Sequence, residues 1–186
     1  MKTIPRRAQA GFTLVELMAV ITIIVILAGI TIGGMGYVKE KEARSKARVQ
    51  IDLLANAMEE YKQDFGTYPL GATAAKGDTN ILFRALYWDS DDNGSGPDAD
   101  LEQKIYLADL DPTLNKQGWV PDNQKAQTKI RDPWGNEYYF RSGKTADGKT
   151  NPGAVNPDFD IWSAGPDGKT SKGAENNDTK DDIKNF

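Results

Sequence analysis

The sequence contains no cysteine and no histidine among its 186 residues. Without cysteine the chain can form no disulfide bond and no thiolate metal site, and it has no thiol nucleophile. Without histidine it lacks the most common general base and the most common zinc ligand. Because no nucleophile–base pattern stands out among the remaining residues, the sequence predicts a protein that is not an enzyme.

An excess of basic residues is also lacking. The chain has 23 Lys and Arg against 27 Asp and Glu, which gives a formal net charge of −4 at pH 7. This balance argues against a broad basic surface, so we expect no nucleic acid partner. It suits a domain that binds cations outside the cytoplasm.

One long stretch is almost free of charge. Residues 12–38 are largely apolar, and Glu16 is the only charged residue in the sequence of this stretch. Because about 20 apolar residues in a helix cross a bilayer core, we expect a membrane span here. Residues 1–11 carry Lys2, Arg6 and Arg7 and no acid, and basic flanks stay in the cytoplasm, so the bulk of the chain is predicted to lie across the membrane.

The basic leader ends at Gly11, directly before the sequence Phe-Thr-Leu-Val-Glu at residues 12–16. An ordinary secretory signal does not fit, because no small-residue cleavage site is evident after the apolar run. The order of leader, glycine and apolar helix resembles the class III signal of type IV pilins and their relatives. The resemblance implies that a prepilin peptidase cuts between Gly11 and Phe12, and that the new Phe12 amine is methylated.

Glu16 needs a physical explanation, because a carboxylate at membrane depth is costly without a partner. It could pair loosely with the Phe12 ammonium of its own helix, or with Phe12 of a neighbouring subunit in a staggered filament. The family resemblance favours the second, which is an assembly role. The alternative is that Glu16 is tolerated near the membrane edge, with its carboxylate reaching the interface.

The helix is predicted to continue beyond the membrane as an amphipathic segment over residues 39–65. Apolar residues recur there at helical spacing and form one stripe, which we expect to pack on a C-terminal sheet: Ala47, Ile51, Leu54, Met58, Tyr61 and Phe65. Gly66 and Pro69 then predict the end of the helix. Residues 66–186 form the predicted globular domain, with a variable region over 66–129 and a sheet and terminal loop over 130–186.

Two strands are predicted in that last region. Residues 131–141 indicate a turn that leads into a strand with aromatic side chains. Residues 159–163 alternate apolar and polar side chains, which is typical of a half-buried second strand.

An acidic stretch over residues 89–100 is similar to an EF-hand loop. It has acids or amides at loop positions 1, 3, 5 and 12 and glycine at position 6. The calcium ligands would be Asp89, Asp91, Asn93, the Ser95 carbonyl and Asp100, where Asp100 replaces the usual bidentate glutamate. The alternative is a solvated acidic turn.

A second group of carboxylates lies near the C-terminus, where adjacent acids repel unless a cation such as calcium lies between them. The sequences Asp-Pro-Trp-Gly (132–135), Ser-Ala-Gly-Pro-Asp-Gly (163–168) and Asp-Asp-Ile (181–183) resemble the major, G-type pseudopilins of type II secretion systems. The resemblance implies a terminal loop that binds Ca²⁺ through Asp167, Thr179, Asp181 and Asp182 and through the carbonyls of Ala164 and Lys169. The loop is longer here than is usual in that family, so Asp178 is an alternative ligand. A solvated acidic tail is the alternative to a metal site.

The resemblance also implies a fold and a function. The fold would be α+β, with a long N-terminal helix packed on a small antiparallel sheet that carries the calcium loop. The protein would be a single-pass inner-membrane subunit with a periplasmic domain, which polymerises into the periplasmic pseudopilus of a secretion system. Its partners would be copies of itself, minor pseudopilins, an inner-membrane assembly platform and the prepilin peptidase. The alternative is a type IV pilin that forms surface fibres for adhesion, motility or DNA uptake.

Overall fold

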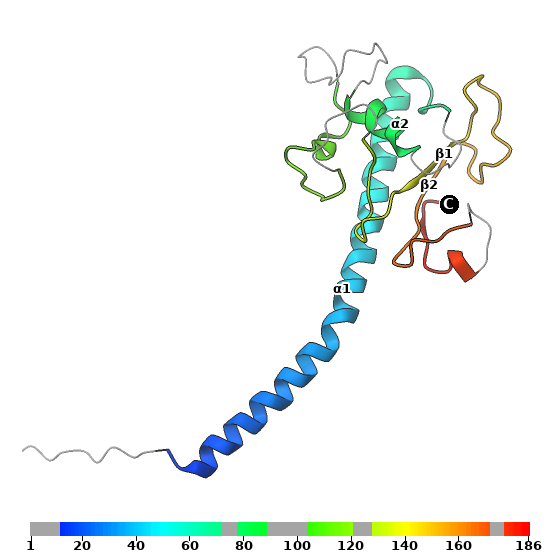
Figure 1. The fold of residues 1–186 in the computed structure, drawn as a ribbon. Coiled ribbons are helices and arrows are strands. Elements are labelled where there is room, and N and C mark those ends of the chain that lie inside the picture. Colours follow the sequence, from blue (N-terminus) through cyan, green and yellow to red (C-terminus); the bar gives the residue numbers. More distant parts are fainter. Residues whose placement is uncertain (1–11, 72–77, 89–103, 121–127, 172–176) are drawn as a thin grey trace, which may run out of the picture. The chain divides into compact units, whose positions relative to one another are not determined.

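The computed structural model describes residues 12–71, 78–88, 104–120, 128–171 and 177–186. The predicted leader with Gly11 and the predicted calcium loop from Asp89 to Asp100 lie outside these residues. The chain divides into two compact units, Met1–Lys41 and Glu42–Phe186. Helix α1 (Leu14–Phe65) runs through both of them (Figure 1).

In the first unit, α1 is an exposed apolar helix. All side chains from Phe12 to Thr31 are exposed, and an 18-residue window of the helix has a mean hydropathy of 2.6 with none of it buried. By length and composition the helix can cross a membrane. Because so much apolar surface is unfavourable in water, we expect lipid or other subunits to cover it.

The end of α1 lies in the second unit and is fixed by a glycine. Gly66 adopts a φ of 75°, and its N–H donates to the Lys62 carbonyl over 2.7 Å. Glycine reaches this left-handed conformation without the steric cost that a side chain would add, so the predicted stop at Gly66 is confirmed.

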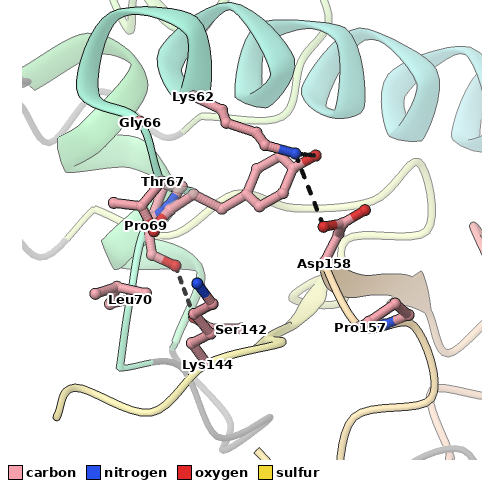
Figure 2. A pocket seen from close by; sticks show the side chains of 10 residues that line it. Lys62, Gly66, Thr67, Pro69, Leu70, Ser142, Lys144, Pro157 and Asp158 are labelled. Carbon is pink, nitrogen blue, oxygen red and sulfur yellow. Dashed lines mark hydrogen bonds and ion pairs between the residues drawn. The ribbon is translucent and has the colours of Figure 1, made fainter. Parts of the chain in front are cut away.

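A polar pocket lies next to the last turn of α1. There, Lys62 Nζ donates to the Tyr68 hydroxyl over 2.9 Å and lies 3.9 Å from the Asp158 carboxylate (Figure 2). These groups line a polar pocket of about 170 Å³.

The apolar stripe of α1 forms the centre of the core in the second unit. Its first four members are at most 3 % exposed, as predicted: Ala47, Ile51, Leu54 and Met58. Phe65, the last predicted member, is 44 % exposed and instead packs beside the Tyr61 ring, with the ring centres 4.5 Å apart. The expectation that the whole stripe packs on the sheet is therefore wrong at Phe65, whose ring lies near Tyr61 and Tyr106, with the centres of the Phe65 and Tyr106 rings 6.3 Å apart.

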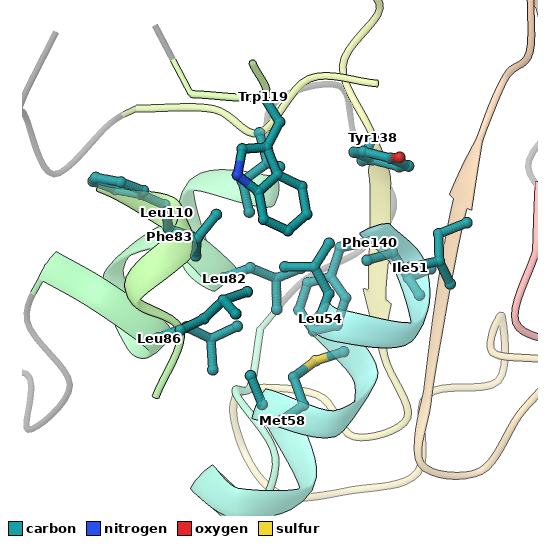
Figure 3. Packing of buried hydrophobic residues seen from close by; sticks show 14 of the residues in the cluster. Ile51, Leu54, Met58, Leu82, Phe83, Leu86, Leu110, Trp119, Tyr138 and Phe140 are labelled. Carbon is teal, nitrogen blue, oxygen red and sulfur yellow. The ribbon is translucent and has the colours of Figure 1, made fainter. Parts of the chain in front are cut away.

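The core cluster around this stripe includes Leu110 and Trp119 and two further groups of side chains (Figure 3). One comes from α2 (Thr79–Phe83) and the π-helical turn η1 (Arg84–Trp88), through Leu82, Phe83 and Leu86. The other includes Tyr138 and Phe140 at the start of the sheet. The sequence predicted only the sheet as the partner of the stripe, so the contact with α2 is additional.

The sheet has three antiparallel strands in the order β1 (Tyr139–Ser142), β2 (Phe159–Ser163) and β3 (Ile183–Lys184). Tyr139 pairs with Trp162, and Ser163 pairs with Ile183. All five residues of β2 are buried rather than half-buried, since its polar side chains have buried partners. A long helix that packs on a small antiparallel sheet confirms the predicted α+β class. Short 3-10 turns lie at Ala108–Leu110 (η2) and Asn177–Thr179 (η3).

Candidate assembly and metal sites

Glu16 and Thr13 form a reciprocal cap at the start of α1. The Glu16 carboxylate accepts from the Thr13 N–H over 2.9 Å and from the Thr13 hydroxyl over 2.7 Å, both at Oε2. The Glu16 N–H donates to Thr13 Oγ1 over 3.2 Å. This is a capping box, which provides partners for backbone N–H groups that a helix start would otherwise leave unpaired.

The cap places the Glu16 carboxylate next to the start of the proposed mature chain. Phe12, the residue before the cap, is 86 % exposed. In the first unit the carboxylate therefore already has a local partner in Thr13, which the sequence analysis missed. The Thr-x-x-Glu spacing at residues 13–16 was the available signal.

In the C-terminal loop, Asp167 and Asp181 lie close together. The Asp167 N–H donates to Asp181 Oδ2 over 3.4 Å. Gly165 has a φ of 64°, and a Cβ added there would lie 2.6 Å from the same Asp181 oxygen. Only glycine therefore allows the backbone to approach Asp181 this closely.

Asp182 is a predicted ligand with a buried carboxylate. Its side chain is fully buried, and its Oδ2 accepts from the Thr170 hydroxyl over 2.9 Å, with Lys184 Nζ at 3.9 Å. Oδ1 is also buried and has no hydrogen-bond partner among the residues that the structure describes. Burial raises the pKa of Asp182, and the negative charges of Asp181 and Asp167 raise it further.

The other predicted ligands are only partly brought together. Ala164 is buried at the end of β2, and Thr179 is buried at the end of η3. Lys169 is exposed, and its N–H donates to Asp167 Oδ1 over 2.8 Å. Within the described ranges, no three Asp or Glu side chains gather closely enough to hold a metal ion.

Thr170 is a loop residue that sequence reasoning missed. It donates to Asp182 and accepts from the Trp162 indole N–H over 3.0 Å, so it links the buried carboxylate to β2. No spacing rule distinguishes this threonine from its neighbours, because the link depends on tertiary contacts.

Comparison with known proteins gives two family matches. Residues 6–32 match the "Prokaryotic N-terminal methylation motif", and residues 71–185 match "Type II secretion system (T2SS), protein G". The second match includes much of the region in which the sequence alone showed nothing specific.

Similar proteins carry the same description. The type II secretion system core protein G of Escherichia coli (strain K12) is 32% identical over 178 residues, covering 96% of this chain and 91% of that protein. The protein of that name from Pectobacterium carotovorum subsp. carotovorum is 30% identical over 182 residues, covering 96% of this chain and 85% of that protein.

A solved structure is also similar, with a TM-score of 0.43 and 21% identity. It is the crystal structure of the major pseudopilin from the type 2 secretion system of enterohaemorrhagic Escherichia coli, and the similarity covers 82% of this chain and 93% of that chain. Because the protein G match covers more than half of the sequence and a relative is 32% identical over nearly all of it, the chain belongs to the type II secretion system protein G family.

Proposed function

We propose that this chain, which belongs to a family of structural subunits rather than enzymes, polymerises into the periplasmic pseudopilus of a type II secretion system. In that role it would help to export folded proteins across the outer membrane. The observation that carries the proposal is the exposed apolar first part of α1, which has a single acidic residue, Glu16, in its first turn. Such a surface is stable only in lipid or against other subunits.

Each segment of the chain has a proposed role in the processing, membrane insertion and assembly of the subunit. Residues 1–11 would be the leader, which a prepilin peptidase removes between Gly11 and Phe12 before the Phe12 amine is methylated. Residues 12–38 would hold the subunit in the inner membrane and later form the filament interior. Residues 39–65 would continue the helix into the periplasm, where residues 66–186 fold. Minor pseudopilins and an inner-membrane platform would be the partners in assembly.

Glu16 would change partners during assembly. Its carboxylate is bound to Thr13 in the first unit, and the Phe12 amine of an incoming subunit offers a full positive charge instead. Away from water, an ammonium donor adds the attraction of a full positive charge, which the neutral donors of Thr13 do not supply. The incoming subunit would thereby be held in register.

Glu16→Gln tests this exchange. Glutamine can occupy the same position of a capping box, but it cannot form an ion pair with an amine. We expect the variant to insert in the membrane and fail to form pseudopili, as seen by electron microscopy, and to fail to release exported proteins. Glu42→Gln is the matched control, since Glu42 is an exposed acid on the same helix outside the apolar run, and it should assemble normally. Normal filaments from Glu16→Gln would end the assembly proposal.

The secretion role is favoured over a type IV pilin by the match of residues 71–185 to protein G. Deletion of the gene separates the two. Loss of exoprotein release with intact surface fibres supports the pseudopilus, and the reverse supports the pilin.

We propose further that the C-terminal loop binds Ca²⁺. The carboxylates of Asp167, Asp181 and Asp182 would hold the ion, with the carbonyls of Ala164 and Lys169 and the hydroxyl of Thr179; Asp178 is an alternative ligand. The buried Asp182 Oδ1, without a partner among the described residues, supports the proposal, because a buried carboxylate oxygen is costly unless something satisfies it. Calcium supplies the charge that would draw these mutually repelling groups together.

Thermal unfolding in chelator and in calcium tests the loop. An ion that binds only the folded state stabilises it by about 2.7 kcal/mol when its free concentration is a hundredfold above the dissociation constant. We expect Asp182→Asn to lose this stabilisation, whereas Asp52→Asn, at an exposed position of α1, keeps it. Equal unfolding temperatures of the natural chain in both buffers would refute the site.

Residues 89–100 are proposed as a second, independent calcium loop, with ligands Asp89, Asp91, Asn93, the Ser95 carbonyl and Asp100. Metal analysis of protein purified without chelator gives the stoichiometry. Two ions per chain would support both loops. A single ion whose binding is lost in Asp182→Asn would support the C-terminal site alone.

A further inference from the structure

The turn that begins at Asp132 is tied to the C-terminal loop through the backbone of one residue, Gly165. Asn136 Nδ2 donates to the Gly165 carbonyl over 3.0 Å. The Gly165 N–H donates to Ser163 Oγ over 3.0 Å, and the Ser163 hydroxyl donates to Asp132 Oδ2 over 2.6 Å. The turn therefore holds both polar backbone groups of Gly165, one directly and one through Ser163.

The turn is itself closed by its own hydrogen bonds. Asp132 Oδ1 accepts from the Trp134 N–H over 3.1 Å and from the Asn136 N–H over 2.8 Å. The Asp132 N–H donates to the Asn136 carbonyl over 2.8 Å, and Asp132 is only 3 % exposed. Because these bonds do not involve the C-terminal loop, the turn does not depend on that loop for its own closure.

The position of Gly165 sets the distances between the proposed calcium ligands. It directly follows Ala164 and comes two residues before Asp167, and its Cα faces Asp181, where an added Cβ would be 2.6 Å from Oδ2. Asn136 also lies close to the loop further on, because a Cβ added at Gly168 would be 3.0 Å from Asn136 Oδ1. A shift of the backbone at Gly165 would therefore displace ligands on both sides of it.

We propose that Asn136 and Ser163 are positioning residues for calcium, which fix the backbone between the ligands without touching the ion. This inference rests on the C-terminal calcium site proposed above. Groups that orient the ligands of a metal are worth about 10–100-fold in metal affinity. Pre-ordering by the turn means that binding does not have to order Gly165, so the affinity is higher than that of a loose acidic loop.

The test is the calcium dissociation constant of the full-length chain in detergent micelles, measured by equilibrium dialysis with radioactive calcium. Asn136→Ala removes the bond to the Gly165 carbonyl, and we expect binding about 10–100-fold weaker. Ser163→Ala interrupts the other connection and is expected to weaken binding as well.

Asn151→Ala is the matched control. Asn151 Nδ2 makes the same kind of bond, to the Ser142 carbonyl over 2.9 Å, in the connection between β1 and β2. We expect it to lower the unfolding temperature in chelator without changing the dissociation constant. A purely structural role of Asn136 would give that same result.

The outcomes separate the two proposals. If the natural chain binds a calcium ion that Asp182→Asn does not bind, and both Asn136→Ala and Ser163→Ala bind this ion equally well, the positioning role is refuted and the C-terminal calcium site stands. If the natural chain binds no calcium, the site fails and the positioning role fails with it. Weaker binding by either variant, with the Asn151→Ala constant unchanged, supports the inference.

Discussion

Asp64 holds the last turn of α1 against the segment that starts at Lys104. Its Oδ2 accepts from Lys104 Nζ over 3.0 Å and from the Tyr106 hydroxyl over 2.8 Å. The bond from Lys104, with a smaller contribution from Tyr106, lowers the pKa of Asp64 from its ordinary value. Asp64 therefore adds stability above its ordinary pKa, and this stability is lost as the pH falls through the lowered value.

We predict that Asp64→Asn flattens the acid limb of the stability curve. In the natural chain, the free energy of unfolding should fall between about pH 5 and pH 2, in part because Asp64 becomes protonated. The variant should lose less over the same range, as measured by urea unfolding. Lys104→Gln, which replaces the charged donor by a neutral one, should give an intermediate slope. Equal slopes for all three proteins would contradict the prediction.

A residue pair that the sequence could not reveal is Arg141 with Asp160. Both are buried, they pair across β1 and β2, and Arg141 Nη1 lies 3.3 Å from Asp160 Oδ2. Asp160 also accepts from the N–H groups of Val155 and Asn156 over 2.9 and 2.7 Å. Asp160 thereby orders the connection between β1 and β2. This connection is rich in glycine, proline and asparagine, so its composition alone suggests a loose segment. Seeing this requires the strand register, which separate strand patterns do not supply.

At the scale of elements, the helical stripe of α1 was predictable because its period alone indicates which side is buried. Leu54 is fully buried in that stripe, whereas Val49 on the same helix is 51% exposed.

We predict that Leu54→Ala destabilises the second unit by about 2–5 kcal/mol through lost burial and a cavity. Val49→Ala should stay within about 0.5 kcal/mol. Denaturant unfolding of the two variants measures the difference, and equal costs would mean that the stripe is not the core.

Elements with few local signals were not predictable. β3 is two residues long, and it forms because Ser163 pairs with Ile183 and because the Ile161 N–H donates to Asn185 Oδ1 over 2.7 Å. Neither contact leaves a pattern in the sequence. For the C-terminal loop, the motif pointed to the carboxylates, but the hydrogen bonds from Thr170 to Asp182 and from Asn136 to Gly165 are tertiary contacts and were missed.

At the scale of the whole molecule, the two proposed activities reside in different units. Glu16 makes its described hydrogen bonds with Thr13, in the first unit. The C-terminal carboxylates, Asp182 among them, lie in the second unit, which has a core of its own. A change at one site should therefore leave the other intact in a dispersed subunit, because sites without shared partners behave additively.

We predict that Glu16→Gln leaves the unfolding temperature of the detergent-dispersed chain and its response to calcium unchanged. Conversely, Asp182→Asn should leave membrane insertion unchanged, as measured by extraction at high pH, while it removes the part of the calcium response that comes from the C-terminal loop. This pair of results would assign the assembly defect of Glu16→Gln to the lost ion pair between subunits rather than to misfolding. A lower unfolding temperature for dispersed Glu16→Gln would show instead that the carboxylate supports the fold of the single subunit. The failure of the Glu16→Gln variant to enter filaments would then give no information about the contact between neighbouring subunits.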